Sequence, residues 1–547
     1  MTAEGGAARE AELASFIESL VAELAPLERE HNDEYWKLAT TGGDEHLRRC
    51  AELDSRMRLA FARPESYARL RRIAAAGPLA DPLLQRQLEL LLAAHRSKQI
   101  PPAMIERQVL IEKRLEAVFT NFRAELDGQP VSDNALVEVL TRSEDVARRR
   151  RAWTAGKQVG AAVEADLLEL VRLRNEGARL LGFANYHVMS LELDELPPEW
   201  LFGLLDRLER ETQPLWNEYR GALERGLAER FGCSVSELRP WHYADPFFQQ
   251  APAAGADLSP FYARQDLEAL TEGFFRACGF EIAPLLRLAD LHERPGKNQH
   301  AFCMSVDRGD DIRVLCNLQP DEKWMGTMLH EFGHAIYDQC VDRSLPWLLR
   351  THAHILSTEA SAMLFGRLSR NPAWLRRWPG ADPAELAKQA GPVARAVREQ
   401  LLVQTRWELV MIHMERALYA DPEQDLRSLW WDLVERFQGV RRPEGRDAPD
   451  WAAKIHFSIA PAYYQNYLLG EMVASQLQET LLERVLGGGP DRWERLSGDP
   501  AVGAFLRERY YAPGRRWTWR ELIVHATGRE LDTAPFVNDL SGWTASA

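Results

Sequence analysis

Apolar residues recur at helical spacing from about Ala8 to Phe122, with polar and charged residues between them. The pattern breaks at residues 40–44 and again at 63–64, where glycine and proline interrupt it. It predicts an antiparallel set of long charged helices in which Tyr35 and Trp36 are packing anchors. The face of the first helix is formed by Leu13, Phe16, Ile17, Leu20, Val21 and Leu24.

A helical period also dominates the rest of the chain, so the pattern predicts a mostly α-helical fold. The clear strand signal consists of two short β-prone runs, 301–306 and 312–316, joined by a glycine-containing turn. They predict one short β-hairpin that leads into an apolar helix around residues 325–337. Further helices are expected at 136–181, 198–230, 348–368, 390–419 and 426–437, followed by a long apolar segment at 462–482.

The apolar helix contains the pattern His-Glu-x-x-His, formed by His330, Glu331 and His334. Because positions i and i+4 lie on one helix face, both imidazoles can turn toward the same metal ion. Zn²⁺ bound in this way lowers the pKa of a water to about 7, and the Glu331 carboxylate can take its proton as the water attacks a carbonyl. The pattern therefore indicates peptide hydrolysis, and the neighbouring apolar residues suit a buried helix: Met325, Met328, Leu329, Phe332, Ala335 and Ile336.

Two histidines leave a zinc site incomplete, and the next predicted helix offers Glu359 as the third ligand. Its neighbours in Ser357-Thr-Glu-Ala-Ser-Ala are small, so the two helices can approach closely. His352 and His354 are rival ligands, but a separation of two residues would place them on different faces of that helix. We therefore expect Glu359 to complete the ligand set of one Zn²⁺ per chain.

The composition indicates an ordinary soluble globular chain, since 46% of its 547 residues are hydrophobic and 27% are charged. No linker or low-complexity segment divides it, so residues 1–547 are expected to form one unit. A net charge of −14 argues against a nucleic-acid partner. The pattern of a signal peptide is not visible at the N-terminus and no apolar run is long enough to span a membrane, so a cytoplasmic location without a membrane partner is expected.

Further elements appear in a definite order between residues 299 and 471: Gln299-His300-Ala301, His330-Glu-Phe-Gly-His334, Glu359, Trp430-Trp431, Lys454-Ile-His456 and Tyr464-Gln-Asn-Tyr467. In this order they resemble the angiotensin-converting enzyme family of zinc dipeptidyl carboxypeptidases, which are gluzincin metallopeptidases. The resemblance implies a large helical peptidase of two subdomains that enclose a long deep cleft. It also implies a helical lid, here residues 1–125, over a catalytic body, here residues 126–547.

The resemblance also implies roles for residues outside the metal set. His456 and Tyr467 would donate hydrogen bonds to the oxyanion that develops at the scissile carbonyl. Lys454 and Tyr464 would hold the free C-terminal carboxylate of the substrate, which explains the release of a dipeptide. The side chain of His300 and the backbone of Ala301 would align the main chain of the substrate.

Four departures from the family pattern change these expectations. The chloride-binding arginines of the family correspond to Asn466 and Val434, so chloride activation is not expected. One extra residue after His456 makes Tyr463 a competitor for either tyrosine role. Met363 replaces a carboxylate that would orient the ligating histidines, so another group must do so. The family's carboxylate-binding glutamine maps near residues 241–243, where no clear match stands.

These observations predict a zinc metallopeptidase for short peptides that releases C-terminal dipeptides, with Glu331 as general base. Short peptides are expected because a lid of helices would exclude folded proteins. Three alternatives remain open at the level of sequence: a related helical oligoendopeptidase, a specialised amide hydrolase in a biosynthetic pathway, and a zinc-binding protein without catalysis.

Overall fold

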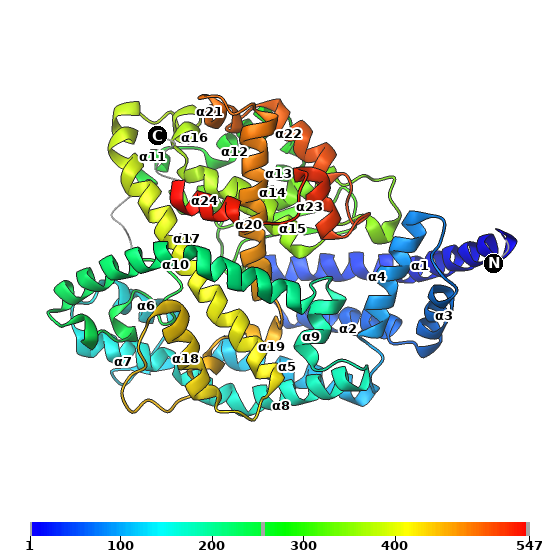
Figure 1. The fold of residues 1–547 in the computed structure, drawn as a ribbon, viewed down its shortest axis with the longest axis horizontal. Helices are drawn as coiled ribbons and strands as arrows, with labels where there is room; N and C mark the ends of the chain where they lie inside the picture. Colours follow the sequence, from blue (N-terminus) through cyan, green and yellow to red (C-terminus); the bar gives the residue numbers. More distant parts are fainter. Residues whose placement is uncertain (1–2, 253–256, 543–547) are drawn as a thin grey trace.

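A computed structural model describes residues 3–252 and 257–542, and nearly all of its regular structure is helical (Figure 1). The mostly α-helical class predicted from the sequence is confirmed. The helices of the N-terminal half are α1 (Ala3–Thr41), α2 (Asp44–Phe61), α3 (Pro64–Ala75), α4 (Pro82–Arg96), α5 (Pro102–Asn121), α6 (Asp133–Arg142), α7 (Val146–Gly156), α8 (Gln158–Leu180), α9 (Tyr186–Leu193), α10 (Pro198–Phe231), α11 (Ser259–Tyr262) and α12 (Leu267–Ala277).

The C-terminal half continues with a second series of helices. These are α13 (Ala283–Leu288), α14 (Glu322–Cys340), α15 (Ile355–Gly366), α16 (Pro372–Arg377), α17 (Pro383–Ala420), α18 (Leu426–Gln438), α19 (His456–Ile459), α20 (Tyr464–Thr480), α21 (Arg492–Leu496), α22 (Pro500–Leu506), α23 (Trp519–Thr527) and α24 (Ala534–Gly542). Within the described ranges, none of these helices is long and apolar enough to cross a membrane.

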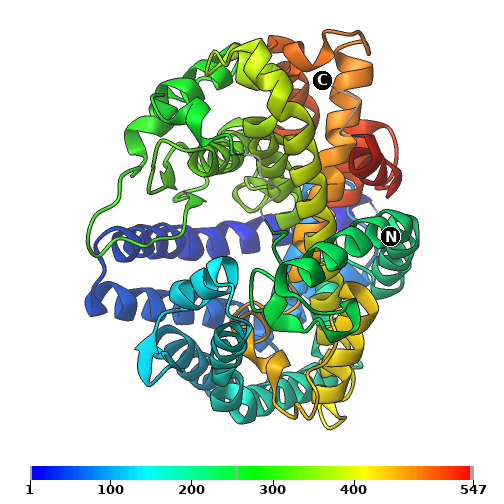
Figure 2. The same cartoon turned by 90° about the vertical axis from the view of Figure 1, so that its left-hand side faces the viewer.

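The first four helices share a hydrophobic core that is separate from the main core. Both Figure 1 and Figure 2 show α1 and α2 in blue between green and orange helices above and cyan helices below. The predicted face of α1 is buried in this core, whose α1 members are Leu13, Ile17, Leu20 and Leu24. The interruption predicted at residues 40–44 separates α1 from α2.

The described residues form two β-hairpins, of which the sequence predicted one. The expected one pairs β3 (Phe302–Ser305) with antiparallel β4 (Ile312–Leu315) directly before α14. The other pairs β1 (Ala124–Leu126) with β2 (Gln129–Val131). Asp127 and Gly128 connect them with φ of 53° and 78°, and a two-residue turn with both φ positive favours this Asp-Gly sequence.

Helix α1 is fastened to the β3–β4 hairpin by polar and aromatic contacts. The Asn32 side chain donates hydrogen bonds to the carbonyls of Ser305 and Val306, each at 3.2 Å. The rings of Tyr35 and Trp36 lie 5.6 and 5.9 Å from the ring of Phe302. The N-terminal helices therefore contact the strand that precedes the His-Glu-x-x-His helix.

Helices α14, α15 and α20 pack closely because small residues lie between them. A Cβ added to Gly333 of α14 would lie 2.8 Å from the Cα of Ala362 in α15. A Cβ at Gly470 of α20 would lie 3.0 Å from the Cβ of Glu359. The close approach predicted from the small residues around Glu359 is thus present, and it brings α15 against the His-Glu-x-x-His helix.

Helix α15 begins later than predicted, at Ile355 instead of 348. His354 caps it, since its Nδ1 accepts a hydrogen bond from the backbone N–H of Leu356 at 3.1 Å. His352 and His354 therefore precede the helix, and the expectation that they occupy two of its faces was wrong. The Nε2 atom of His354 lies 2.9 Å from a carboxylate oxygen of Asp194, so this ring is already engaged away from His330 and His334.

Candidate metal centre

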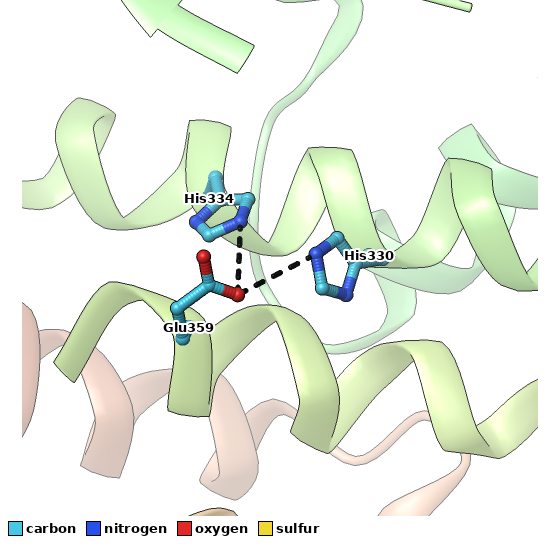
Figure 3. Close-up of side chains that lie close together, drawn as sticks. All are labelled: His330, His334 and Glu359. Atoms are coloured by element: carbon cyan, nitrogen blue, oxygen red, sulfur yellow. Dashed lines mark ion pairs between the residues drawn. The ribbon is translucent and has the colours of Figure 1, made fainter. Parts of the chain in front are cut away.

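His330 and His334 project from one face of α14 toward Glu359 on α15 (Figure 3). The Oε2 atom of Glu359 lies 3.8 Å from Nε2 of His330 and 3.9 Å from Nε2 of His334. One ligand atom from each residue falls within 4.8 Å of the other two. The helical spacing of the two histidines and the packing of α15 therefore bring three donor atoms to one point.

This donor set fits a zinc ion. Two imidazoles and one carboxylate are the protein ligands of several catalytic zinc sites, with the fourth position left for water or substrate. Burial lowers the pKa of His330 to about 4, so its imidazole is neutral and has a free lone pair at neutral pH. All three residues also border an open cavity, which leaves room for a fourth ligand.

Glu331 lies beside the donor set, is 7% exposed and borders the same cavity. Burial and the charge of Glu359 raise the pKa of Glu331 to about 8. A divalent cation at the site would act in the opposite direction, because a nearby positive charge favours the carboxylate. Glu331 is therefore a buried carboxyl group that borders the same cavity as the candidate metal donors.

Thr358 supports one of the histidines. Its hydroxyl lies 2.7 Å from Nδ1 of His334, so Nδ1–H can donate to it while Nε2 faces Glu359. The carboxylate that the family places near this point is Met363 here, and Thr358 is a group that can orient the ring in its place. Sequence reasoning missed Thr358, although it stands directly before Glu359.

The cavity beside the donor set has a volume of about 880 Å³. It is bordered by α14, α15, α17, α20 and the segment 301–303. Four of the residues that the sequence assigned to catalysis or substrate binding line it: Ala301, Glu331, Tyr463 and Tyr467. His352 and Met363 line it as well. The side chain of His300 is exposed, and His300, Lys454, His456 and Tyr464 are not among the lining residues.

The two competing tyrosines occupy different surroundings. Tyr463 hydrogen-bonds Glu359, a contact that opposes the rise in the pKa of that carboxyl to about 7 by burial and by Glu471. Its ring lies 5.1 Å from the ring of Tyr467. Tyr464 is buried instead, with its ring 4.8 Å from that of His456. Tyr463 and Tyr467 thus face the metal donors, and Tyr464 belongs to the group around His456.

Lys454 lies at a second polar group, which includes a glutamine that the sequence did not reveal. Its Nζ donates a hydrogen bond to Oε1 of Gln249 at 2.9 Å. Gln400, which borders the cavity, accepts from the backbone N–H of Ala251 at 2.9 Å and so adjoins this group. Burial lowers the pKa of Lys454 to about 8, and the charge of Asp245 opposes this shift. Gln249 lies beyond the 241–243 region, in a loop whose position depends on tertiary packing.

Two family models match the chain in succession. The model described as angiotensin-converting enzyme matches residues 7–240, and the model described as peptidase family M3 matches residues 285–540. The second match includes α14 and α15 with all three donors.

Individual relatives agree with these models. Carboxypeptidase 1 of Bacillus subtilis is 27% identical over 44% of this chain and 52% of its own length. The inactive angiotensin-converting enzyme-related protein of Caenorhabditis elegans is 21% identical over 73% of this chain and 48% of its own length. The angiotensin-converting enzyme of Theromyzon tessulatum is 21% identical over 74% of this chain and 69% of its own.

The matches and the His₂Glu donor set point to one class of protein. They support an angiotensin-converting enzyme-like family of gluzincin peptidases, to whose members the chain is similar. It spans about half the length of the first two of these relatives.

Proposed function

We propose that the protein is a zinc-dependent peptidase that removes dipeptides from the C-terminus of short peptides. The observation that carries this proposal is the convergence of His330, His334 and Glu359 beside Glu331 in a cavity of about 880 Å³. The similarity to the relative named carboxypeptidase 1 supports action at a free C-terminus.

The proposed chemistry assigns one task to each residue around the donors. A zinc ion held by His330, His334 and Glu359 would supply a Lewis acid that polarises the carbonyl and lowers the pKa of water. Glu331 accepts a proton from the attacking water and then delivers it to the leaving amine. Tyr467, which borders the cavity, donates a hydrogen bond to the oxyanion.

The far end of the substrate is assigned to the group around Lys454. Its ammonium and the amide of Gln249 offer hydrogen-bond donors to a C-terminal carboxylate. Tyr464 packs beside His456 and would complete this side of the site. A carboxylate held at a fixed distance from the metal donors determines which peptide bond reaches them, which accounts for the release of two residues.

Closure of the site is part of the proposal. His456 lies outside the cavity lining, and its Nδ1 is buried without a hydrogen-bond partner in the part of the chain that the structure describes. For His456 to act as the second oxyanion donor beside Tyr467, the segment 454–456 must move toward the metal cavity when substrate binds. The aligning role of His300 requires a similar approach, whereas Ala301 already borders the cavity.

Residues 1–125 would form the lid over a catalytic body of residues 126–547, and together they would act as one unit. The separate core of the first four helices and their attachment to β3 support this division. The lid would restrict substrates to short or unfolded peptides.

Mass spectrometry of the products from matched peptides tests the proposal. One peptide has a free C-terminus and the other ends in an amide, and both are incubated with the zinc-loaded protein. We expect the free peptide to lose a dipeptide and the amide to react far more slowly, because it lacks the charge that Lys454 binds.

The variant Lys454→Met should remove the difference in rate between the two peptides, and Lys113→Met is its matched control. Lys113→Met changes an exposed lysine on α5 and should retain it. Equal cleavage of both peptides by the wild-type protein would favour an oligoendopeptidase and overturn the dipeptide-releasing mode.

A further inference from the structure

A second cavity, of about 760 Å³, lies next to the metal cavity. Ile355 and Tyr463 line both of them. The other walls of the second cavity come from different elements, namely α4, α5, α8, α9 and residues 515–518. The two cavities thus meet at the start of α15 and α20, close to the ligand Glu359.

The acidic groups inside the second cavity already have partners. Glu195 accepts hydrogen bonds from Arg86, one of them at 3.0 Å. Asp194 lies 2.9 Å from Nε2 of His354, and Glu112 accepts from Arg174 at 2.7 Å. The other two lining acids, Glu89 and Glu192, are exposed to solvent.

Two cations that line the same cavity have no such partner. Within residues 3–252 and 257–542, neither the Lys98 ammonium nor the Arg515 guanidinium forms a side-chain hydrogen bond or ion pair, and Nε of Arg515 is buried. Burial lowers the pKa of both side chains. Among the charged residues of the lining, the unused hydrogen-bonding capacity is therefore that of cationic donors, which suits a carboxylate. The described lining also includes the amide oxygen of Asn466, a buried acceptor without a partner among the described residues.

The direction of a bound peptide follows from the proposed function, on which this inference rests. A C-terminus held at Lys454 and Gln249 lies on the side of Gln400 and α17. The chain then passes the metal donors, and its N-terminal part continues beyond Tyr463 and Ile355. We propose that the second cavity receives the residues before the scissile bond and that Lys98 and Arg515 select an acidic side chain there.

The selection would arise because an acidic side chain supplies an acceptor to cationic donors that have none. The Nε–H of Arg515 is buried without an acceptor among the described residues, so it has lost water without gaining a partner, and a substrate carboxylate would supply one. Charge-assisted hydrogen bonds of this kind correspond to a preference of about tenfold or more for a glutamate over a glutamine at the position concerned.

A peptide series tests this selection. Glutamate or glutamine is placed in turn at each of the four positions before the scissile bond, and kcat/KM is measured for each pair with zinc-loaded protein. We expect one position to show a glutamate to glutamine ratio of about ten or more. The ratio should fall to about one in Lys98→Gln or Arg515→Gln, because a carboxylate then gains no charged donor. Because each ratio is internal to one preparation, partial misfolding of a variant does not affect it.

Lys113→Gln serves as the matched control, since Lys113 is exposed on α5, lies outside the cavity and should leave the ratio unchanged. A wild-type ratio near one at all four positions, or an unchanged ratio in both variants, would overturn the selection. Cleavage of the glutamine peptides tests the proposed function separately. If no peptide is cleaved, binding to Glu331→Gln by calorimetry decides the selection: tighter binding of a glutamate peptide supports it, and equal binding overturns it.

Discussion

The side chain with the clearest pH-dependent role in the proposed site is Lys454. Burial among Phe247, Trp407 and Gln249 places its pKa near 8, well below that of a solvated lysine. Its ammonium is present below this pH and is lost as the pH rises through it. The affinity for a C-terminal carboxylate should follow that change.

We predict that KM for a peptide with a free C-terminus rises as the pH increases through about 8. Steady-state kinetics from about pH 6 to about pH 10 will measure this rise in KM, because these limits lie on either side of the lowered pKa of Lys454. Lys454→Arg should abolish the rise, because a guanidinium remains charged over this range. A rise of the same size with the amidated peptide would assign the titration to another group.

Thr358 gives a second prediction at this scale. Thr358→Val keeps the side-chain volume and removes the hydroxyl that contacts His334, so zinc affinity should fall about 10- to 100-fold. Competition with a chelator measures this affinity without any assay of activity. Thr358→Ser retains the hydroxyl, so its zinc affinity should stay near the wild-type value. Equal zinc affinities for the wild type and both variants would show that Thr358 does not support zinc binding.

At the scale of elements, the site depends on how closely α15 lies against α14. Gly333 stands between His330 and His334 in sequence and faces Ala362 and the carbonyl of Ser361. The candidate metal donors therefore come from α14 and α15, and these helices can lie this close because Gly333 has no side chain.

Gly333→Ala should destabilise the fold by about 1–3 kcal/mol and weaken zinc binding, because the added methyl moves α15 and with it Glu359. Thermal unfolding and zinc titration measure the two effects. Gly203→Ala is the matched control, since a Cβ at this exposed position of α10 meets no atom within 4 Å and alanine favours a helix. Unchanged zinc affinity in Gly333→Ala would show that α14 and α15 accommodate the added methyl group without displacing Glu359.

The elements differ in how far the sequence predicted them. Strong apolar periodicity identified α1, α14 and α18, with α18 at 426–438 against an expected 426–437. The start of α15 was missed because it depends on capping by His354, a residue whose partner Asp194 lies far away in the sequence. The hairpin β1–β2 was missed because each strand has only three residues, too few for a clear alternation.

The candidate site shows the same limit. A local helical spacing predicted His330, Glu331 and His334, and small neighbours pointed to Glu359. Gln249 could not be found in this way, because its contact with Lys454 joins residues 205 positions apart. Contacts between such distant segments depend on tertiary packing, which local spacing does not record.

At the scale of the whole molecule, the proposed arrangement is a single unit in which the N-terminal helices form a lid over the catalytic body. Asn32, Tyr35 and Trp36 attach α1 to the hairpin whose first strand begins at Phe302, and Phe302 lines that cavity. The size of acceptable substrates should therefore depend on how firmly this lid is held.

We predict that Asn32→Ala raises the rate on a long unfolded polypeptide relative to a short peptide, because the lid loses its two hydrogen bonds to β3 and the residue after it. Product analysis measures the two rates, and their ratio is compared between the variant and the wild type. Glu18→Gln, on an exposed position of the same helix, should leave the ratio as it is. An unchanged ratio in Asn32→Ala would remove α1 from the control of substrate size.

The most direct test of the central claim compares wild-type protein with Glu331→Gln at equal, measured zinc content. A peptide with a free C-terminus is incubated with each, and the initial rate of dipeptide release is determined. We predict that both proteins bind one zinc ion and that Glu331→Gln loses about 10²- to 10⁴-fold in rate, since its amide cannot accept the proton from water. Dipeptide release at the wild-type rate by the zinc-loaded variant would contradict it.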